Sequence, residues 1–120
     1  MTLSIVDLRQ TNEGHVLVLP KLHFETLDEL PPSLFNPLMS AVVRMTRAVR
    51  RCFAPDGINV WQSNGIGAAQ EVRHIHFHVF PRKVGDGHFA IYPGTVRDSA
   101  PETLDRLAAR LRTTLSREDA

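Results

Sequence analysis

Three histidines alternate with apolar residues in one short stretch, His74-Ile75-His76-Phe77-His78-Val79-Phe80. Successive side chains of a β-strand point to opposite faces, so a strand over Glu71–Pro81 would place the three imidazoles in a row on one face. Ile75, Phe77 and Val79 would then face a core. This row of imidazoles predicts a site that either binds a metal ion or attacks phosphorus.

The length, composition and charge of the chain limit the class of protein that carries this row of histidines. Its 120 residues, 42% of them hydrophobic, predict a single domain over residues 1–120. A formal net charge of +1 gives no reason to expect a nucleic acid or an acidic membrane surface as partner. The one cysteine, Cys52, allows no intrachain disulfide and no cysteine zinc cage. Together with the lack of a signal peptide or a long apolar run, this predicts a cytoplasmic protein without a membrane span.

The order of apolar runs and turn residues predicts an α+β fold, an antiparallel β-sheet with a central helix and a C-terminal helix. Strands are expected where β-forming residues run between turn residues and prolines. These strands cover Leu3–Leu8, His15–Leu19, Ile58–Gln62 and Glu71–Pro81. Antiparallel pairing is favoured because helices do not alternate with strands: only some of the predicted strands are followed by a helix.

The two helices are predicted from apolar residues at helical spacing. The central helix covers Leu38–Phe53, with Asn36 as its cap and Pro37 at its first position. In the C-terminal helix, Ser99 and Glu102 have the spacing of a capping box. The apolar stripes are Leu38, Val42, Met45, Val49 and Cys52, and then Leu104, Leu107, Ala108, Leu111 and Leu115. Four arginines on the central helix indicate a solvated face, with a phosphate or nucleic-acid patch as the alternative: Arg44, Arg47, Arg50 and Arg51.

The histidine row can be read in two chemical ways. Two alternating histidines can ligate zinc, but three on one strand would span about 13 Å, which is wide for a single tetrahedral ion. A neutral imidazole is also a good nucleophile near pH 7, and it can form a covalent intermediate with a phosphoryl group. Its flanking histidines could then contact the phosphate oxygens and the leaving group. The second reading is favoured, and no metal is assigned.

The loop before the histidines suits an anion. Asn64-Gly65-Ile66-Gly67-Ala68-Ala69-Gln70 is built mostly of small residues, which let backbone N–H groups approach a phosphate. The amides of Asn64 and Gln70 can donate further hydrogen bonds. The glycines alone would indicate only a hairpin turn, and the neighbouring histidines favour the phosphate interpretation.

These residues resemble the histidine triad family of nucleotide hydrolases and transferases. The triad is His74-Ile75-His76-Phe77-His78-Val79-Phe80, and the approach through Asn64-Gly65 and Ala68-Ala69-Gln70 is similar to that of the family. Upstream, Gly14-His15-Val16-Leu17-Val18-Leu19-Pro20-Lys21 with His23 resembles the family's second block. The resemblance runs from about Ile5 to Gly87.

The resemblance implies a role for each triad residue. His76 would be the nucleophile that takes the nucleoside monophosphate, and water would then release it. His74 would fix His76 through its backbone carbonyl, and His78 would contact the phosphate. Gln70 would contact the phosphate or bridge to the leaving group.

Further roles follow from the same resemblance. Asn64 would hold phosphate oxygens, Asp7 would bind the ribose, and His15 would pack behind the site. The family's members are typically homodimers, so a homodimer with a nucleotide substrate is expected. No cofactor would be required, and a divalent cation would enter only with a polyphosphate substrate.

Three departures from the family pattern accompany these expectations. Ala69 stands where glycine is usual, and Glu71 stands where many relatives have Ser or Thr. The chain also begins close to the ribose position, which predicts an N-terminally short fold. Its base pocket would then be reduced, filled by a partner subunit, or cut short by truncation.

The substrate class is left with several alternatives. Pro81-Arg82-Lys83 followed by Gly85-Asp86 resembles the fragile histidine triad and bacterial dinucleoside polyphosphate hydrolase branches. Dinucleoside polyphosphates are therefore favoured, with an adenosine phosphoramidate second. A nucleotide-binding or interaction protein with little turnover is the alternative function, and a metal-dependent enzyme is a third. Trp61 is expected in the core or at an interface.

Overall fold

The structure, a computed structural model, describes residues 1–88 and 94–118 of the chain. Its contacts form two compact units, Met1–Asp86 and Gly87–Ala120, and each is described by itself. The single domain expected over residues 1–120 stays a prediction. Within the described ranges, no helix is both long and apolar enough to cross a membrane.

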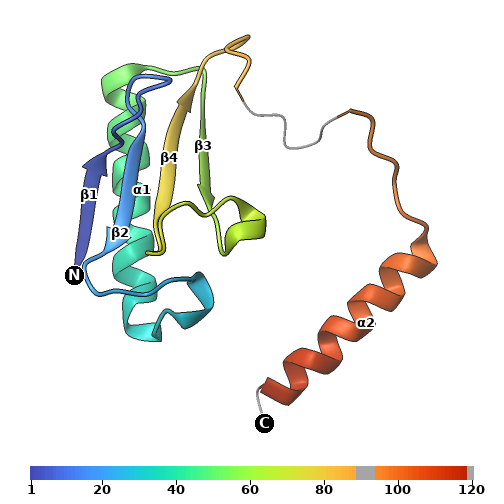
Figure 1. The fold of residues 1–120 in the computed structure, drawn as a ribbon. Coiled ribbons are helices and arrows are strands. Elements are labelled where there is room, and N and C mark those ends of the chain that lie inside the picture. Colours follow the sequence, from blue (N-terminus) through green and yellow to red (C-terminus); the bar gives the residue numbers. More distant parts are fainter. Residues whose placement is uncertain (89–93, 119–120) are drawn as a thin grey trace. The chain divides into compact units, whose positions relative to one another are not determined.

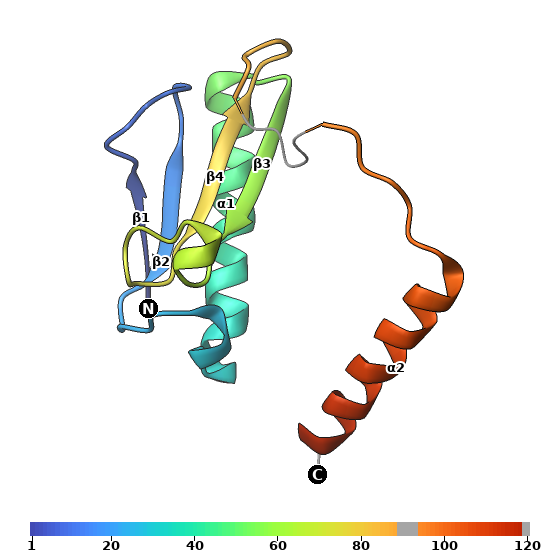
Figure 2. The same cartoon turned by 45° about the vertical axis from the view of Figure 1, so that its right-hand side comes forward.

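The first unit is a four-stranded antiparallel sheet with a helix along one face (Figures 1 and 2). The strands lie in the order β1-β2-β4-β3, and every neighbouring pair is antiparallel. Their bounds are β1 Thr2–Val6, β2 Val16–Pro20, β3 Gly57–Gln62 and β4 Phe77–Arg82. The helix is α1, Phe35–Phe53. The second unit contains α2, Pro101–Glu118. The predicted α+β class with an antiparallel sheet is confirmed.

Three short 3₁₀ turns complete the first unit: η1 Leu27–Glu29, η2 Pro32–Leu34 and η3 Ile66–Ala68. The core lies between the sheet and α1, where Ile75, Val18 and Val79 are fully enclosed. Phe77 is half-buried and packs against this core. The prediction that Ile75, Phe77 and Val79 face a core is therefore confirmed. The histidines are left on the opposite, open face of the sheet.

The predicted histidine strand is too long. Strand β4 begins only at Phe77, so His74 and His76 precede the ladder. The reason lies in the pairing, because β2 contributes only Val16–Val18 to β4 and β3 ends opposite Phe77 at Gln62. Ile75 is held differently, by donating its N–H to the carbonyl of Phe24 at 2.8 Å.

The start of the central helix also differs from the prediction. Helix α1 begins at Phe35, and Leu34 rather than Asn36 occupies the cap position, without a side-chain capping bond. Pro37 still lies in the first turn, where a backbone N–H has no intrahelical partner to lose. The preceding turn η2 feeds directly into the helix and shifts its start. Cys52, expected on the apolar stripe, is exposed.

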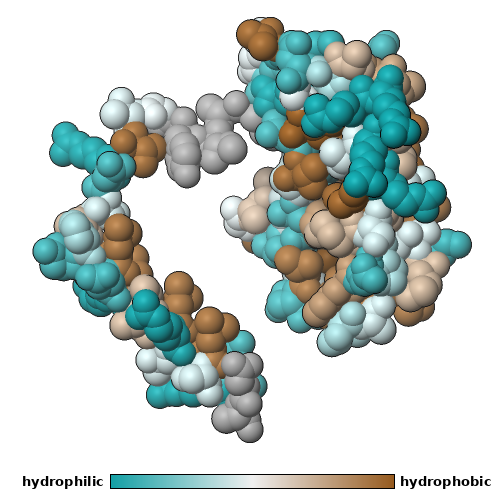
Figure 3. Space-filling model, turned by 180° about the vertical axis from the view of Figure 1, so that it is seen from behind, coloured by the Kyte–Doolittle hydropathy of each residue, from teal (hydrophilic) through white to brown (hydrophobic). Residues whose placement is uncertain are grey.

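The surfaces of both helices follow the sequence pattern in part. The four arginines of α1 are exposed, as a solvated face requires, and Figure 3 shows hydrophilic side chains over this side of the molecule. Apolar side chains gather along one side of α2 in the same view. Helix α2 begins at Pro101, and the carbonyl of Ala100 accepts its first bonds. Ser99 is therefore one residue too early to be the predicted cap.

Candidate active site

His76 is held as a nucleophile by the backbone just before β4. Its Nδ1 lies 2.7 Å from the carbonyl oxygen of His74. A carbonyl can only accept, so Nδ1 carries the proton and Nε2 keeps its lone pair. A nucleophilic imidazole attacks with such a lone pair, so Nε2 is the attacking atom. The predicted contact between His76 and the His74 carbonyl is present.

The His74 ring is fixed by two partners of its own. Its Nε2 donates to the carbonyl of Pro20 at 2.9 Å. Its Nδ1 lies 3.0 Å from Nδ1 of His23, so in the neutral pair His23 donates to His74. This arrangement locks the residue whose carbonyl orients His76. His23, which belongs to the second sequence block, thus braces His74.

His78 and Asp7 are half-buried and lie in a row with the buried His15. Nδ1 of His78 is 2.9 Å from Nε2 of His15, and Nδ1 of His15 is 3.8 Å from the Asp7 carboxylate. Burial lowers the pKa of His15, and the nearby Asp7 carboxylate opposes that effect. Burial, with smaller contributions from His76 and His15, lowers the pKa of His78 from 6.5 to about 4. His78 is therefore an uncharged imidazole at neutral pH.

Asp7 is positioned by its own turn. Its Oδ1 accepts the backbone N–H of Arg9 at 2.7 Å, and its backbone N–H donates to the carbonyl of His15. Gln10 adds a brace by donating to the carbonyls of Asp7 and His15. The turn that carries Asp7 is thus bound to the start of β2. This places the carboxylate beside His15 and His78. The ribose contact expected of Asp7 stays a prediction.

Asn64 and Gln70 form the frame of the loop after β3. Gln70 accepts the N–H of Gly65 and donates to the carbonyl of Glu25, each at 2.7 Å. Asn64 accepts the N–H of Leu27 at 2.7 Å and exchanges two bonds with Gln62. These bonds run to the segment before α1, to the end of β3 and within the loop, rather than to the triad rings. The phosphate contacts expected of both amides stay predictions.

The structure shows the surroundings of Ala69 and Glu71, the two residues here that depart from the family pattern. Ala69 has φ 60° and ψ 34°, the left-handed conformation that glycine adopts without strain. The backbone therefore keeps a shape suited to the usual glycine. Glu71 lies 3.5 Å from the guanidinium of Arg9, and both side chains are largely exposed. This pairing partly offsets the charge of Glu71.

Asp7, His15 and His78 bring three possible metal-ligand atoms within 4.8 Å of one another. Two nitrogen ligands of one tetrahedral zinc ion stand about 3.4 Å apart, given bonds of about 2.0–2.1 Å. The 2.9 Å between His15 and His78 is instead a hydrogen-bond distance. His15 and His78 would have to give up their mutual hydrogen bond to bind an ion together.

The open face carries apolar residues that the sequence reading did not single out. Strand register places Leu17 opposite both His78 and Ile5, and Leu19 opposite Leu3. These four leucine and isoleucine side chains share the face of the histidines because residues alternate along each strand. Leu3 and Ile5 are 44% and 42% exposed. The alternation His15, Leu17, Leu19 was visible in the sequence, but the pairing that aligns it with His78 was not.

Trp61 is the other missed residue. It was expected in the core or at an interface. It is half-buried on the open face, so the core alternative is wrong and the interface alternative stays a prediction. Its ring lies 4.1 Å from that of His78 and is tilted from it by only 5°. The tryptophan therefore belongs to the site.

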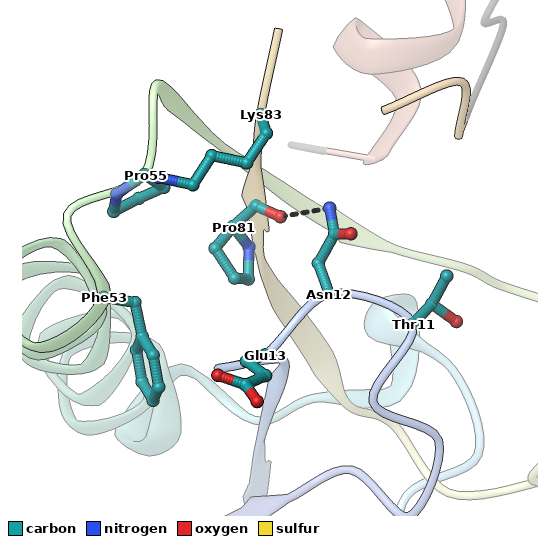
Figure 4. Close-up of a pocket in the computed structure, with 7 residues that line it drawn as sticks. All are labelled: Thr11, Asn12, Glu13, Phe53, Pro55, Pro81 and Lys83. Atoms are coloured by element: carbon teal, nitrogen blue, oxygen red, sulfur yellow. Dashed lines mark hydrogen bonds between the residues drawn. The ribbon is translucent and has the colours of Figure 1, made fainter. Parts of the chain in front are cut away.

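A surface pocket of about 230 Å³ lies elsewhere (Figure 4). Residues of the β1–β2 turn, the end of α1 and the end of β4 line it: Thr11, Asn12, Glu13, Phe53, Pro55, Pro81 and Lys83. Asn12 donates to the carbonyl of Pro81 at its edge, and the Lys83 ammonium donates to the carbonyl of Ala54. No triad histidine lines this pocket. The triad stands where β4 begins, whereas the pocket lies where β4 ends.

Comparison with known proteins identifies the family of the chain. A model described as "HIT domain" matches residues 1–85. A crystal structure of a member of the HIT family from Bacillus subtilis superposes with a TM-score of 0.85 at 34% identity. The match covers 93% of this chain and 80% of that one.

Two curated relatives have named activities. The adenylylsulfatase HINT3 of Arabidopsis thaliana is 38% identical over 86 residues, which are 72% of this chain and 44% of that protein. The adenosine 5'-monophosphoramidase HNT1 of Saccharomyces cerevisiae is 36% identical over 80 residues, 67% of this chain and 48% of that protein. The chain thus spans about half the length of these two relatives.

Proposed function

Because the chain belongs to the HIT family, we propose that it is a nucleotide hydrolase or transferase that works through His76. The observation that carries this proposal is the 2.7 Å bond from His76 Nδ1 to the His74 carbonyl, which leaves Nε2 free to attack. The names of the Arabidopsis and yeast relatives support a nucleoside monophosphate group as the part that is transferred.

The reaction would proceed in two displacements at phosphorus. Nε2 of His76 attacks the α-phosphorus, a P–N bond forms, and the bond from phosphorus to the leaving oxygen or nitrogen breaks. The leaving group takes up a proton, and the nucleoside monophosphate stays on His76. Water then attacks the same phosphorus and gives up a proton, which balances the proton taken up by the leaving group; the P–N bond breaks, and the monophosphate leaves while His76 is restored. Both steps use the ring and need no metal ion.

The nucleoside would lie across the open face. The row Leu3, Ile5 and Asp7 runs beside the row His15, Leu17 and Leu19. An apolar surface next to a carboxylate suits a base and its ribose hydroxyls, respectively. The surface is shallow, since Leu3 and Ile5 are more than two-fifths exposed. We propose that Asp7 binds the ribose and that Asn64, Gln70 and the loop amides face the phosphates.

Dinucleoside polyphosphates are the first substrates to test, followed by adenosine phosphoramidate and adenylyl sulfate. The chain's own residues after the triad favour the first class, and the names of the two relatives favour the other two. A divalent cation would arrive with the polyphosphate. We also propose a homodimer, which light scattering would test. Strands β1 and β3 are the two edge strands of the sheet in the described part of the chain.

The test measures release of nucleoside monophosphate from each substrate and traps the intermediate. A P–N bond survives alkaline quenching, so mass spectrometry should find a nucleotide on the peptide that contains His76. His76→Ala should lose both release and adduct, whereas Arg47→Ala on the far helix face should keep both. Full release by His76→Ala would refute the covalent mechanism. Absence of release by the folded wild type would favour a binding role.

A further inference from the structure

The chain's single tryptophan stacks on a triad histidine. Trp61 on β3 and His78 on β4 are direct cross-strand partners. Their ring centroids are 4.1 Å apart, and the planes differ by 5°. The two rings therefore lie face to face on the open side of the sheet.

The surrounding rings restrict both partners. His15 lies 5.1 Å from the His78 ring at 26°, and Phe80 meets the Trp61 ring edge-on at 5.6 Å. Phe80 also meets His15 edge-on at 4.8 Å. The nucleophile His76 stands 4.8 Å from His78 at an angle of 60°. Trp61 thus connects the aromatic cluster to the ring beside the nucleophile.

We infer that Trp61 is a positioning residue, which fixes the ring plane of His78 beside the phosphorus bound to His76. The inference rests on the proposed function. The His15 contact engages Nδ1 of His78 and leaves Nε2 for the substrate. One hydrogen bond lets an imidazole pivot about it, and a face-to-face stack on an indole removes that freedom.

The stack also keeps water from one face of the His78 ring. Trp61 carries no charge, and the ionisable groups around His78 are His76 just before β4, His15 just before β2 and Asp7 just after β1. The same burial lowers the pKa of His78. Removal of the indole should therefore both loosen the ring and expose it to solvent.

The first test needs no substrate. In NMR spectra of protein with labelled histidines at pH 7, the indole ring current should shift the ring protons of His78 upfield. His78→Gln identifies the signal by its loss. Trp61→Leu should remove the upfield shift, and Trp61→Phe should retain part of it. His78 protons without an upfield shift in the wild type, or unmoved by Trp61→Leu, would overturn the inference.

The second test is kinetic. Trp61→Leu should lower kcat about tenfold with KM within about twofold, because misorientation of a group beside the reacting atoms acts on the chemical step. The pH at which the rate of Trp61→Leu falls on the acidic side of its pH profile (the acidic limb) should also rise, toward the ordinary pKa of histidine. Trp61→Phe should recover most of the rate. Val60→Ala, the neighbour on β3 that points to the opposite face, is the matched control.

The outcomes separate the two proposals. If Trp61→Leu keeps the wild-type kcat and acidic limb, or loses no more rate than Val60→Ala, the positioning role is wrong while the proposed function stands. If the folded wild type releases no monophosphate from any substrate, the proposed function is wrong, and the positioning role is overturned with it. The NMR shift then still tells whether the stack exists in solution.

Discussion

Gly14→Ala should be among the most destabilising single changes that add one methyl group to this chain. Gly14 directly precedes His15, and its φ of +101° lies in a region that L residues rarely adopt. A Cβ at this position would lie 2.5, 2.8 and 2.9 Å from three ring atoms of Phe53. Ordinary contacts of a Cβ are 3.4–4 Å. The methyl group would therefore meet both backbone strain and steric overlap.

The expected magnitude has two parts. An L residue at such a φ costs about 1–2 kcal/mol, and overpacking by one methyl group costs about 1–3 kcal/mol. Phe53 is 39% exposed, so its ring can move partly aside, and the lower half of that second range applies. The free energy of unfolding, measured by urea denaturation, should fall by about 2–4 kcal/mol.

A double-mutant cycle separates the two parts. In a Phe53→Ala background the overlap is gone, so Gly14→Ala should cost only its backbone strain of about 1–2 kcal/mol. Gly57→Ala is the matched control, because a Cβ there meets nothing within 4 Å. An equal cost of Gly14→Ala with and without Phe53 would refute the overlap argument. A cost no larger than that of Gly57→Ala would refute both parts.

Four further outcomes are expected. As pH falls from 6.5 to about 4, the unfolded chain binds a proton before the folded His78 does, so the free energy of unfolding should fall. Allowing for solvent access, His78→Gln should remove about 1–2 kcal/mol of this fall in urea titrations. Ala69→Gly, which relieves a φ of 60°, should raise that free energy by about 0.5–1 kcal/mol at pH 7. Leu17→Ser should raise KM about tenfold and leave kcat within about twofold, because it weakens ground-state and transition-state binding alike. Dialysis against EDTA should leave release of monophosphate from adenosine phosphoramidate unchanged.

The sequence predicted those features that depend on alternation and local chemistry. The faces of Ile75 and Val79, and the existence of the four strands and two helices of the described residues, follow from spacing along the chain. Each of these is decided by residues close in sequence or by the two-residue period of a strand. They could be predicted without knowing which strands are neighbours.

The features that were missed depend on pairing between distant segments. Trp61 meets His78, and Leu17 lies opposite it, only because β3 and β2 flank β4 in a particular register. A shift of one residue would send either side chain to the other face. Gln70 shows the same limit, since its partner at Glu25 is 45 residues away.

The misplaced start of β4 has a chemical consequence. A carbonyl inside a ladder is usually bonded to a neighbouring strand and is then less available to a side chain. His74 precedes the ladder, so its carbonyl can accept the Nδ1–H of His76 two residues later. Had the strand run from Glu71 as the pattern predicts, His74 would have been a pairing residue. Because regular pairing starts only at Phe77, the His74 carbonyl is free to set the tautomer of His76. Strand β4 itself holds His78 against Trp61 and His15.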